Sequence, residues 1–192
     1  MAERPRYYWD ACAWIALIKQ EAGRFDDLNF LVDQARAKTV EIWTSAFTLA
    51  EVFKRQCDSE KKGLTIVDDT SFEDLILQDW VMTVQVDYHV GQLARRLLRA
   101  YPGIAKPQDA IHLATALLHN LDEVHTFDRK NLTDLNGKIQ RKDGKSLRIC
   151  APPKKPAPTP DNQMSLLDNI DKAQEQGGTE EIGKQAGAAG PS

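Results

Sequence analysis

The sequence contains no long apolar run, few cysteines and no excess of basic charge. None of its 192 residues belongs to a stretch approaching the ~18 consecutive apolar residues that a membrane span needs, and the polar start Met1–Arg6 does not resemble a secretory signal. The cysteines Cys12, Cys57 and Cys150 are odd in number and widely spaced, which argues against a disulfide framework and a structural zinc site. We therefore expect a cytoplasmic protein with reduced thiols and no membrane partner.

The overall charge is slightly negative, with 25 basic and 28 acidic residues and a net charge of −3. Taken alone, this balance argues against a nucleic-acid partner, because phosphate binding depends on Lys and Arg. Residues 1–150, however, hold 21 basic and 22 acidic residues. If four of these acids surround a cation, as argued below, the remaining surface is basic and a nucleic-acid substrate is allowed.

Composition divides the chain at Ala151. Five prolines occur in the nine residues 152–160, which predicts an extended spacer. The sequence after the spacer is rich in Gly, Ala and Gln and has little apolar surface to bury. We predict one globular domain over residues 1–150 and a disordered, flexible tail over residues 151–192.

One short apolar segment interrupts this tail. Gln163–Leu167 resembles the Gln-x-Ser-Leu-Phe type of peptide by which bacterial replication and repair proteins bind the sliding clamp, with Leu167 where an aromatic residue is usual. A short apolar anchor on a mobile spacer suits recognition by a partner protein. The simpler interpretation is an apolar turn that packs on its own domain or is merely tolerated.

Within residues 1–150, short runs rich in β-branched or aromatic residues alternate with longer segments of helical periodicity. The predicted strands are Arg6–Trp9, Val40–Ser45, Val81–Val86, Glu123–Phe127 and Leu147–Cys150. The predicted helices are Ala11–Lys19, Phe25–Ala37, Leu49–Cys57, Phe72–Gln78, Val90–Arg99 and Asp109–Asn120. Strands separated by helices need crossover connections, so we predict a three-layer α/β/α domain with a mostly parallel sheet of about five strands.

Four acidic residues stand near the predicted strand ends and helix starts. Asp10 and Asp128 directly follow strands, Glu51 comes six residues after the second strand, and Asp109 opens the last helix. Ligands of open α/β sheets bind outside the carboxyl ends of the strands. Each acid also suits a helix cap, and Glu51 stands at capping-box spacing from Thr48.

Carboxylates that meet in one crevice repel one another, and a divalent cation removes that repulsion. Mg²⁺ or Mn²⁺ takes oxygen ligands and can activate water and bind a phosphate. The four acids therefore predict metal-dependent hydrolysis of phosphodiesters.

Four segments carry the motifs of the chain, and the last three contain the elements Thr-x-x-Glu, Asp-Ala-x-His-x-Ala-x-Ala and Thr-x-Asp. They are Tyr7–Ile18, Trp43–Val52, Lys106–Ala116 and His125–Leu132. In order and spacing, over about residues 6–150, they resemble the PIN-domain nucleases, most closely the VapC-type ribonuclease toxins of bacterial toxin–antitoxin pairs. The resemblance implies an endoribonuclease that hydrolyses RNA and leaves 5′-phosphate and 3′-hydroxyl ends, a homodimer and a cognate antitoxin.

The resemblance also assigns roles to residues. The metal ligands for one or two Mg²⁺ or Mn²⁺ ions would be Asp10, Glu51, Asp109 and Asp128. The hydroxyl of Thr126 would lie near the reacting water, with Thr44 or Ser45 as further candidates. Two features depart from the family: Ala11 and Cys12 stand where many relatives have a hydroxyl residue, and the long tail is unlike the compact toxins.

Nearby residues have less specific roles. His112 is predicted to fill a packed, hydrogen-bonded position rather than to act as a base, and Cys12 to be a small buried side chain rather than a reactive thiol. Lys106 and Arg129–Lys130 flank the acids and are the preferred phosphate contacts. A homodimer is also favoured by an aromatic content that exceeds what one small core hides, namely Trp14, Phe30, Trp43, Phe53, Phe72 and Trp80.

Other functional classes fit less well. A receiver domain needs an acidic pair at the end of its first strand, and a haloacid-dehalogenase-type phosphatase needs Asp-x-Asp there, whereas Asp10 is single and position 12 is Cys. Two alternatives remain open. One is a PIN-type nuclease in RNA processing or DNA-linked repair that is docked through its tail, and the other is a non-enzymatic interaction protein whose acids only cap helices.

Overall fold

The computed structural model describes residues 4–53, 64–128 and 132–157. The chain divides into two units, residues 1–155 and 156–192, and the description below concerns the first. Within the described ranges, no helix is long and apolar enough to cross a membrane. The segment Gln163–Leu167 lies outside the described residues, and the predicted boundary at residue 150 stays a prediction.

Five strands form one sheet in the order β3-β2-β1-β4-β5, and every neighbouring pair is parallel. The strands are β1 (Arg6–Trp9), β2 (Glu41–Ser45), β3 (Val81–Val84), β4 (Glu123–His125) and β5 (Arg148–Cys150). Their register pairs Tyr8 with Trp43 of β2 and Trp9 with His125 of β4. The predicted parallel five-stranded sheet is confirmed, with strand ends that differ from prediction by two residues or fewer.

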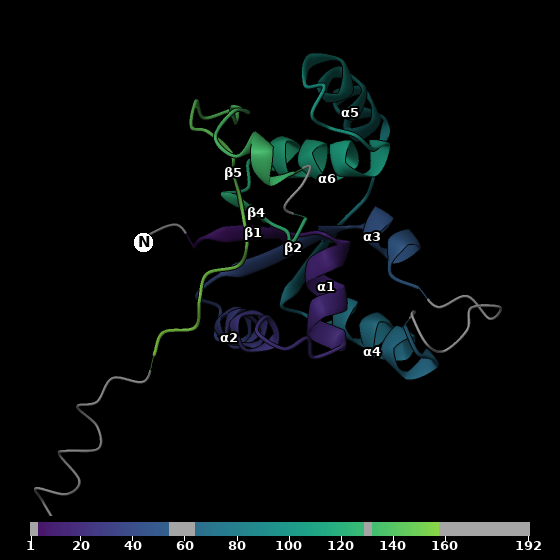
Figure 1. The fold of residues 1–192 in the computed structure, drawn as a ribbon, viewed down its shortest axis with the longest axis vertical. Coiled ribbons are helices and arrows are strands. Elements are labelled where there is room, and N and C mark those ends of the chain that lie inside the picture. Colours follow the sequence, from purple (N-terminus) through teal and green to yellow (C-terminus); the bar gives the residue numbers. More distant parts are fainter. Residues whose placement is uncertain (1–3, 54–63, 129–131, 158–192) are drawn as a thin grey trace, which may run out of the picture. The chain divides into compact units, whose positions relative to one another are not determined.

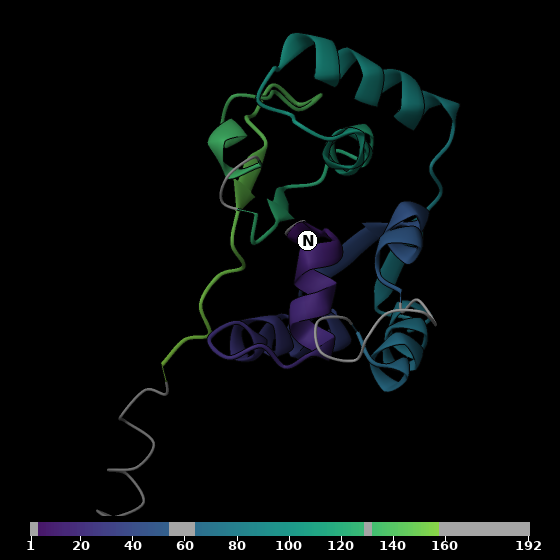
Figure 2. The same ribbon diagram turned by 45° about the vertical axis from the view of Figure 1, so that its right-hand side comes forward.

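Helices cover both faces of this sheet (Figures 1 and 2). One face carries α1 (Ala11–Ile18), α2 (Phe25–Arg36) and α4 (Ile66–Ile76). The other carries α5 (Tyr88–Ala100) and α6 (Pro107–Leu118). The short α3 (Ala46–Glu51) continues directly from β2, and a single 3₁₀ turn, η1, covers Thr133–Leu135. The three-layer α/β/α prediction is confirmed.

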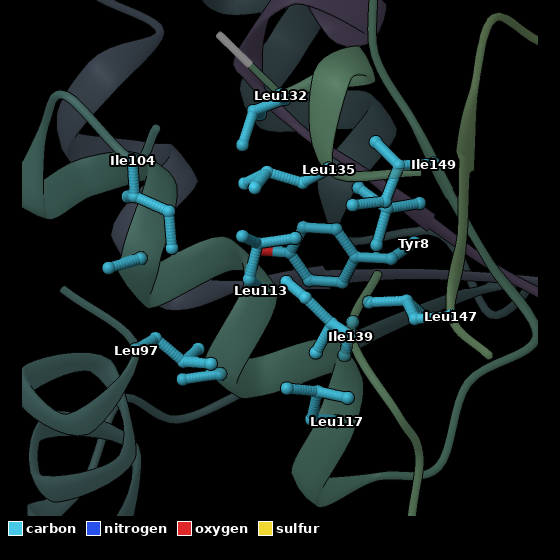
Figure 3. Packing of buried hydrophobic residues seen from close by; sticks show 14 of the residues in the cluster. Tyr8, Leu97, Ile104, Leu113, Leu117, Leu132, Leu135, Ile139, Leu147 and Ile149 are labelled. Atoms are coloured by element: carbon cyan, nitrogen blue, oxygen red, sulfur yellow. The ribbon is translucent and has the colours of Figure 1, made fainter. Parts of the chain in front are cut away.

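The central strand β1 contributes to a core on each face of the sheet. Successive side chains of a strand point to opposite faces, and Tyr8 and Trp9 are both fully buried. Tyr8 packs among the apolar residues of α5, α6, β5 and the η1 region, including Leu113 and Ile149 (Figure 3). Trp9 packs in the second core, where its ring centroid lies 5.0 Å from that of Trp14 in an edge-on contact.

Two helices, α3 and α4, begin well before the starts that the periodicity predicts. The helix predicted over Leu49–Cys57 is observed as α3, which starts directly after Ser45, while residues 54–57 lie outside the described residues. The Thr48 hydroxyl does not cap a helix but lies 2.9 Å from the Thr44 hydroxyl, so Glu51 ends α3 instead of lying in a first turn. Helix α4 begins at Ile66, before the predicted start at Phe72, because the capping box of Thr65 and Asp68 encloses two exposed apolar residues that break the periodic pattern.

Candidate active site

The four predicted acids meet in one pocket at the carboxyl ends of β1, β2 and β4. The pocket has a volume of about 180 Å³ and is lined by Asp10, Ala11, Cys12, Glu51, Lys106, Gln108, Asp109, His112 and Asp128. The sheet order places β2 and β4 on either side of β1, so chain segments that leave three adjacent strands border the same space. Helix α6 adds its first turns from the Tyr8 side of the sheet.

Asp10 both caps a helix and lines the pocket. Its Oδ1 accepts a hydrogen bond from the backbone N–H of Ala13 at 3.1 Å, which makes it the N-cap of α1. The hydroxyl of Thr126 also hydrogen-bonds this carboxylate and accepts from the backbone N–H of Asp128 at 3.0 Å. Burial raises the pKa of Asp10, and these hydrogen bonds and His112 oppose the rise. Capping and a site role are therefore compatible at this residue.

Asp109 has an unsatisfied oxygen. It lies in the first turn of α6 after Pro107, as predicted, and its Oδ2 is buried without a hydrogen-bond partner. Desolvation raises the pKa of Asp109, and the charges of Asp128 and Glu51 raise it further, while Lys106 and His112 act in the opposite direction. A buried carboxylate oxygen without a partner costs stability unless a positive group meets it.

Glu51 is held by a histidine 61 residues away in the chain. The Nε2 of His112 lies 2.6 Å from Glu51 Oε2, and the His112 side chain is 3% exposed. His112 is thus packed and hydrogen-bonded, although its bond to a proposed metal ligand was not foreseen. The available signal was its spacing: His112 follows Asp109 by three residues and so shares one helix face with it.

The pKa of the Cys12 thiol is affected by the negative charge of the pocket. The residue is exposed and lines the pocket, so the expectation of a buried side chain is wrong. Its partial desolvation raises the pKa of the thiol to about 12, and the charges of the four acids raise it in the same direction. At neutral pH the side chain therefore stays a thiol and not a nucleophilic thiolate.

The hydroxyls of Thr44 and Ser45 serve internal contacts. Thr44 Oγ1 lies 3.0 Å from the Trp9 carbonyl oxygen and accepts from the Trp14 indole N–H at 3.3 Å. Ser45 Oγ lies 2.9 Å from the hydroxyl of Tyr8. Both side chains are fully buried, and these internal hydrogen bonds satisfy their hydroxyls without any contact to the pocket lining.

The donor set of the pocket fits a hard divalent cation. Four carboxylates supply oxygen ligands of the kind that Mg²⁺ and Mn²⁺ take, and one of them keeps a buried oxygen without a partner. Among the described residues that line the pocket, Lys106 is the only group with a permanent positive charge. Arg129–Lys130, the other predicted phosphate contact, lies outside the described residues.

A second cluster of potential ligands has its hydrogen bonds already arranged. The ligand atoms of Glu123, His125 and Cys150 lie within 4.8 Å of one another. The indole N–H of Trp9, which can only donate, lies 3.2 Å from His125 Nδ1, so that nitrogen accepts and Nε2 carries the hydrogen. His125 Nε2 donates that hydrogen to Glu123 Oε2 at 3.0 Å and has no lone pair to offer a metal.

The solved structures that this chain is similar to include proteins of bacterial toxin–antitoxin systems. VapC20 of Mycobacterium tuberculosis, described as a toxin that cleaves the sarcin–ricin loop, is 19% identical with a TM-score of 0.49, covering 64% of this chain and 90% of its own. VapBC2 of Rickettsia felis, solved with a promoter DNA fragment, is 20% identical with a TM-score of 0.47, covering 75% and 98%. A toxin–antitoxin complex of Klebsiella pneumoniae is 21% identical with a TM-score of 0.47, covering 66% and 89%.

Sequence comparison gives a family but no individual relative. No curated protein matches the sequence significantly. The family model described as the PIN domain matches residues 7–138, a range that contains all four acids of the pocket and extends from β1 past η1. This match covers more than half of the chain, so the protein belongs to the PIN domain family.

Proposed function

We propose that this protein is a metal-dependent endoribonuclease that hydrolyses RNA phosphodiester bonds. The observation that carries the proposal is the buried, unpartnered Oδ2 of Asp109 in a pocket lined by three further acids. Such an arrangement is short of positive charge and is stabilised when a cation binds. Membership of the PIN domain family supports nuclease chemistry at this pocket.

In the proposed site, one or two Mg²⁺ or Mn²⁺ ions are held by Asp10, Glu51, Asp109 and Asp128. The bound ion supplies a Lewis acid for the phosphate and lowers the pKa of water. Thr126 keeps Asp10 and Asp128 together through its hydroxyl. Lys106 brings a positive charge to the rim that attracts the phosphate backbone.

The biological role that we propose is that of the toxin of a type II toxin–antitoxin pair, acting in the cytoplasm and bound by a cognate antitoxin. Its support is the order and spacing of the four motif segments within residues 6–150. A homodimer stays a prediction, and the aromatic argument for it holds only in part. Trp14, Phe72 and Trp80 are buried in the core of a single chain. Phe30 and Trp43 are half-buried, and Phe53 is exposed. Clamp docking through Gln163–Leu167 also stays a prediction.

The test uses the full chain with single-stranded RNA and with DNA of the same sequence. We expect RNA cleavage with Mg²⁺ or Mn²⁺ that leaves 5′-phosphate ends, and no cleavage in excess EDTA or by the Asp10→Asn variant. The end groups are read by phosphatase-dependent labelling. Full cleavage in EDTA would refute metal dependence, and cleavage of DNA alone would refute the choice of RNA.

A further inference from the structure

A line of hydrogen bonds leads from the pocket into the core. Glu51 Oε2 lies 2.6 Å from His112 Nε2, and His112 Nδ1 lies 2.7 Å from the hydroxyl oxygen of Tyr8. The Tyr8 hydroxyl in turn lies 2.9 Å from Ser45 Oγ. These four side chains come from α3, α6, β1 and the end of β2, so the line joins four elements around one edge of the pocket.

The Glu51 carboxylate fixes the role of one nitrogen of the His112 ring. An ionised carboxylate can only accept, so His112 Nε2 carries the hydrogen and donates it to Glu51. The Tyr8 hydroxyl lies within hydrogen-bond distance of both His112 Nδ1 and Ser45 Oγ, so it links the ring to β2. Burial raises the pKa of Tyr8, which keeps this hydroxyl protonated as a donor.

The imidazole ring is fixed more firmly than the carboxylate that it contacts. Its centroid lies 5.6 Å from the Tyr8 ring and 5.9 Å from the Phe47 ring. Glu51, by contrast, is 22% exposed and ends a helix of six residues. A Glu side chain with this freedom loses rotamer entropy when it binds a ligand. The bond to His112 holds Oε2 in place before a ligand binds.

We propose that His112 is a positioning residue that orients the Glu51 carboxylate toward the cation, with Tyr8 and Ser45 holding the ring. This inference rests on the proposed metal site and adds a residue to it. Hydrogen-bond partners of metal ligands typically change metal affinity by 10- to 100-fold when they are removed. His112 acts through Glu51, so its effect is expected in metal binding itself and not only in catalysis.

Two substitutions of His112 test the contributions of the two ring nitrogens separately. The amide nitrogen of Gln can take the place of Nε2, so His112→Gln retains a donor to Glu51. Asn is shorter and reaches only the place of Nδ1, so His112→Asn loses that donor. We expect titration calorimetry with Mn²⁺ alone to show 10- to 100-fold weaker binding for His112→Asn and near wild-type binding for His112→Gln.

A double-mutant comparison distinguishes positioning from a general structural effect. In a Glu51→Gln background, His112→Asn should weaken Mn²⁺ binding no further, because the two residues act as one unit. A full additional loss would overturn the proposal. Circular dichroism and thermal unfolding without metal establish that each variant is folded.

If His112→Asn does not fold, Tyr8→Phe provides a second test. It keeps the aromatic ring in the core and removes only the hydroxyl that holds His112 Nδ1. We expect weaker Mn²⁺ binding than in the wild type, and unchanged binding would overturn the proposal. Absence of Mn²⁺ binding by the wild-type protein would instead refute the proposed function. If His112→Asn changes neither Mn²⁺ binding nor RNA cleavage, only the role of His112 is refuted.

Discussion

Two histidines of this domain each hydrogen-bond a glutamate, yet the surrounding charges differ. His112 contacts Glu51 at 2.6 Å in the acidic pocket, and His125 contacts Glu123 at 3.0 Å within β4. Glu123 also accepts from the Arg148 guanidinium at 2.8 Å. The hydrogen bond from His125 lowers the pKa of Glu123, and Arg148 lowers it further. The negative charge of the Glu123 carboxylate is therefore already balanced by its hydrogen bond from His125 and by Arg148.

The acidic pocket shows the opposite pattern. Burial raises the pKa of both Asp10 and Asp109, and neighbouring carboxylates raise it further. The difference follows from position: Glu123 lies within a strand beside Arg148 of the adjacent strand, whereas the pocket acids lie after strands or at helix ends and face a shared space. The ligand atoms of the Glu123 cluster lie close together, but its carboxylate is paired with Arg148, whereas the four acids of the pocket have a single permanently charged cation, Lys106, among the described residues that line it.

The largest expected effect comes from exchanging one carboxylate for an amide in each cluster. Asp109→Asn should lower RNA cleavage by about 1000-fold, because a metal contributes several kcal/mol and each 1.36 kcal/mol is tenfold in rate. It should also stabilise the metal-free protein, because a buried unpaired charge is removed. The matched control Glu123→Gln should retain cleavage and lose stability. The measurements are initial cleavage rates and urea unfolding, and loss of cleavage in Glu123→Gln alone would reverse the assignment.

A smaller effect is expected in the rate at which the two cysteines are alkylated. The negative pocket contributes to the raised pKa of Cys12, about 12, whereas the pKa of Cys150, about 11, is raised by burial and by Glu123. A cation bound by the four acids should therefore lower the pKa of Cys12 only. In a Cys57→Ser background, alkylation of Cys12 at pH 8 should rise severalfold with Mg²⁺ and that of Cys150 should not change, as read by peptide mass spectrometry. Equal responses at both thiols would contradict the two-cluster comparison.

The smallest effect is expected in the pH dependence of stability without metal. The pKa of Asp109 is raised in the folded state, so stability should fall as pH rises from its ordinary 3.8 through the raised value. The pKa of Glu123 is lowered, so its contribution is complete above its ordinary 4.5 and is lost as pH falls through the lowered value.

Urea unfolding in EDTA across this pH range tests both signs. Asp109→Asn should remove the loss of stability on the high-pH side, and Glu123→Gln should remove the loss on the acid side. Identical pH profiles for the two variants and the wild type would contradict the assignment.

Local patterns predicted the five strands, because alternation and β-branched runs are properties of short segments. They failed at α3, where the Thr-x-x-Glu spacing suggested a capping box but the Thr48 hydroxyl bonds Thr44 instead. They failed again at the start of α4, where capping by Thr65 overrides the apolar pattern. In both places side-chain hydrogen bonds differ from what the pattern suggests, and periodicity carries no information about them.

The sequence alone determined that Asp10 and Asp128 follow strands and that Asp109 lies in the first turn of a helix, since each lies next to a recognisable element. It placed Glu51 in a first helical turn, whereas Glu51 ends α3. Only the tertiary structure decided which side chains hydrogen-bond to the acids and histidines of the two clusters. His112 meets Glu51 across 61 residues, and Trp9 meets His125 across 116, where its indole N–H occupies the nitrogen lone pair that a metal would need. Such pairs depend on strand order and register, which bring distant segments together at separations that no local pattern encodes.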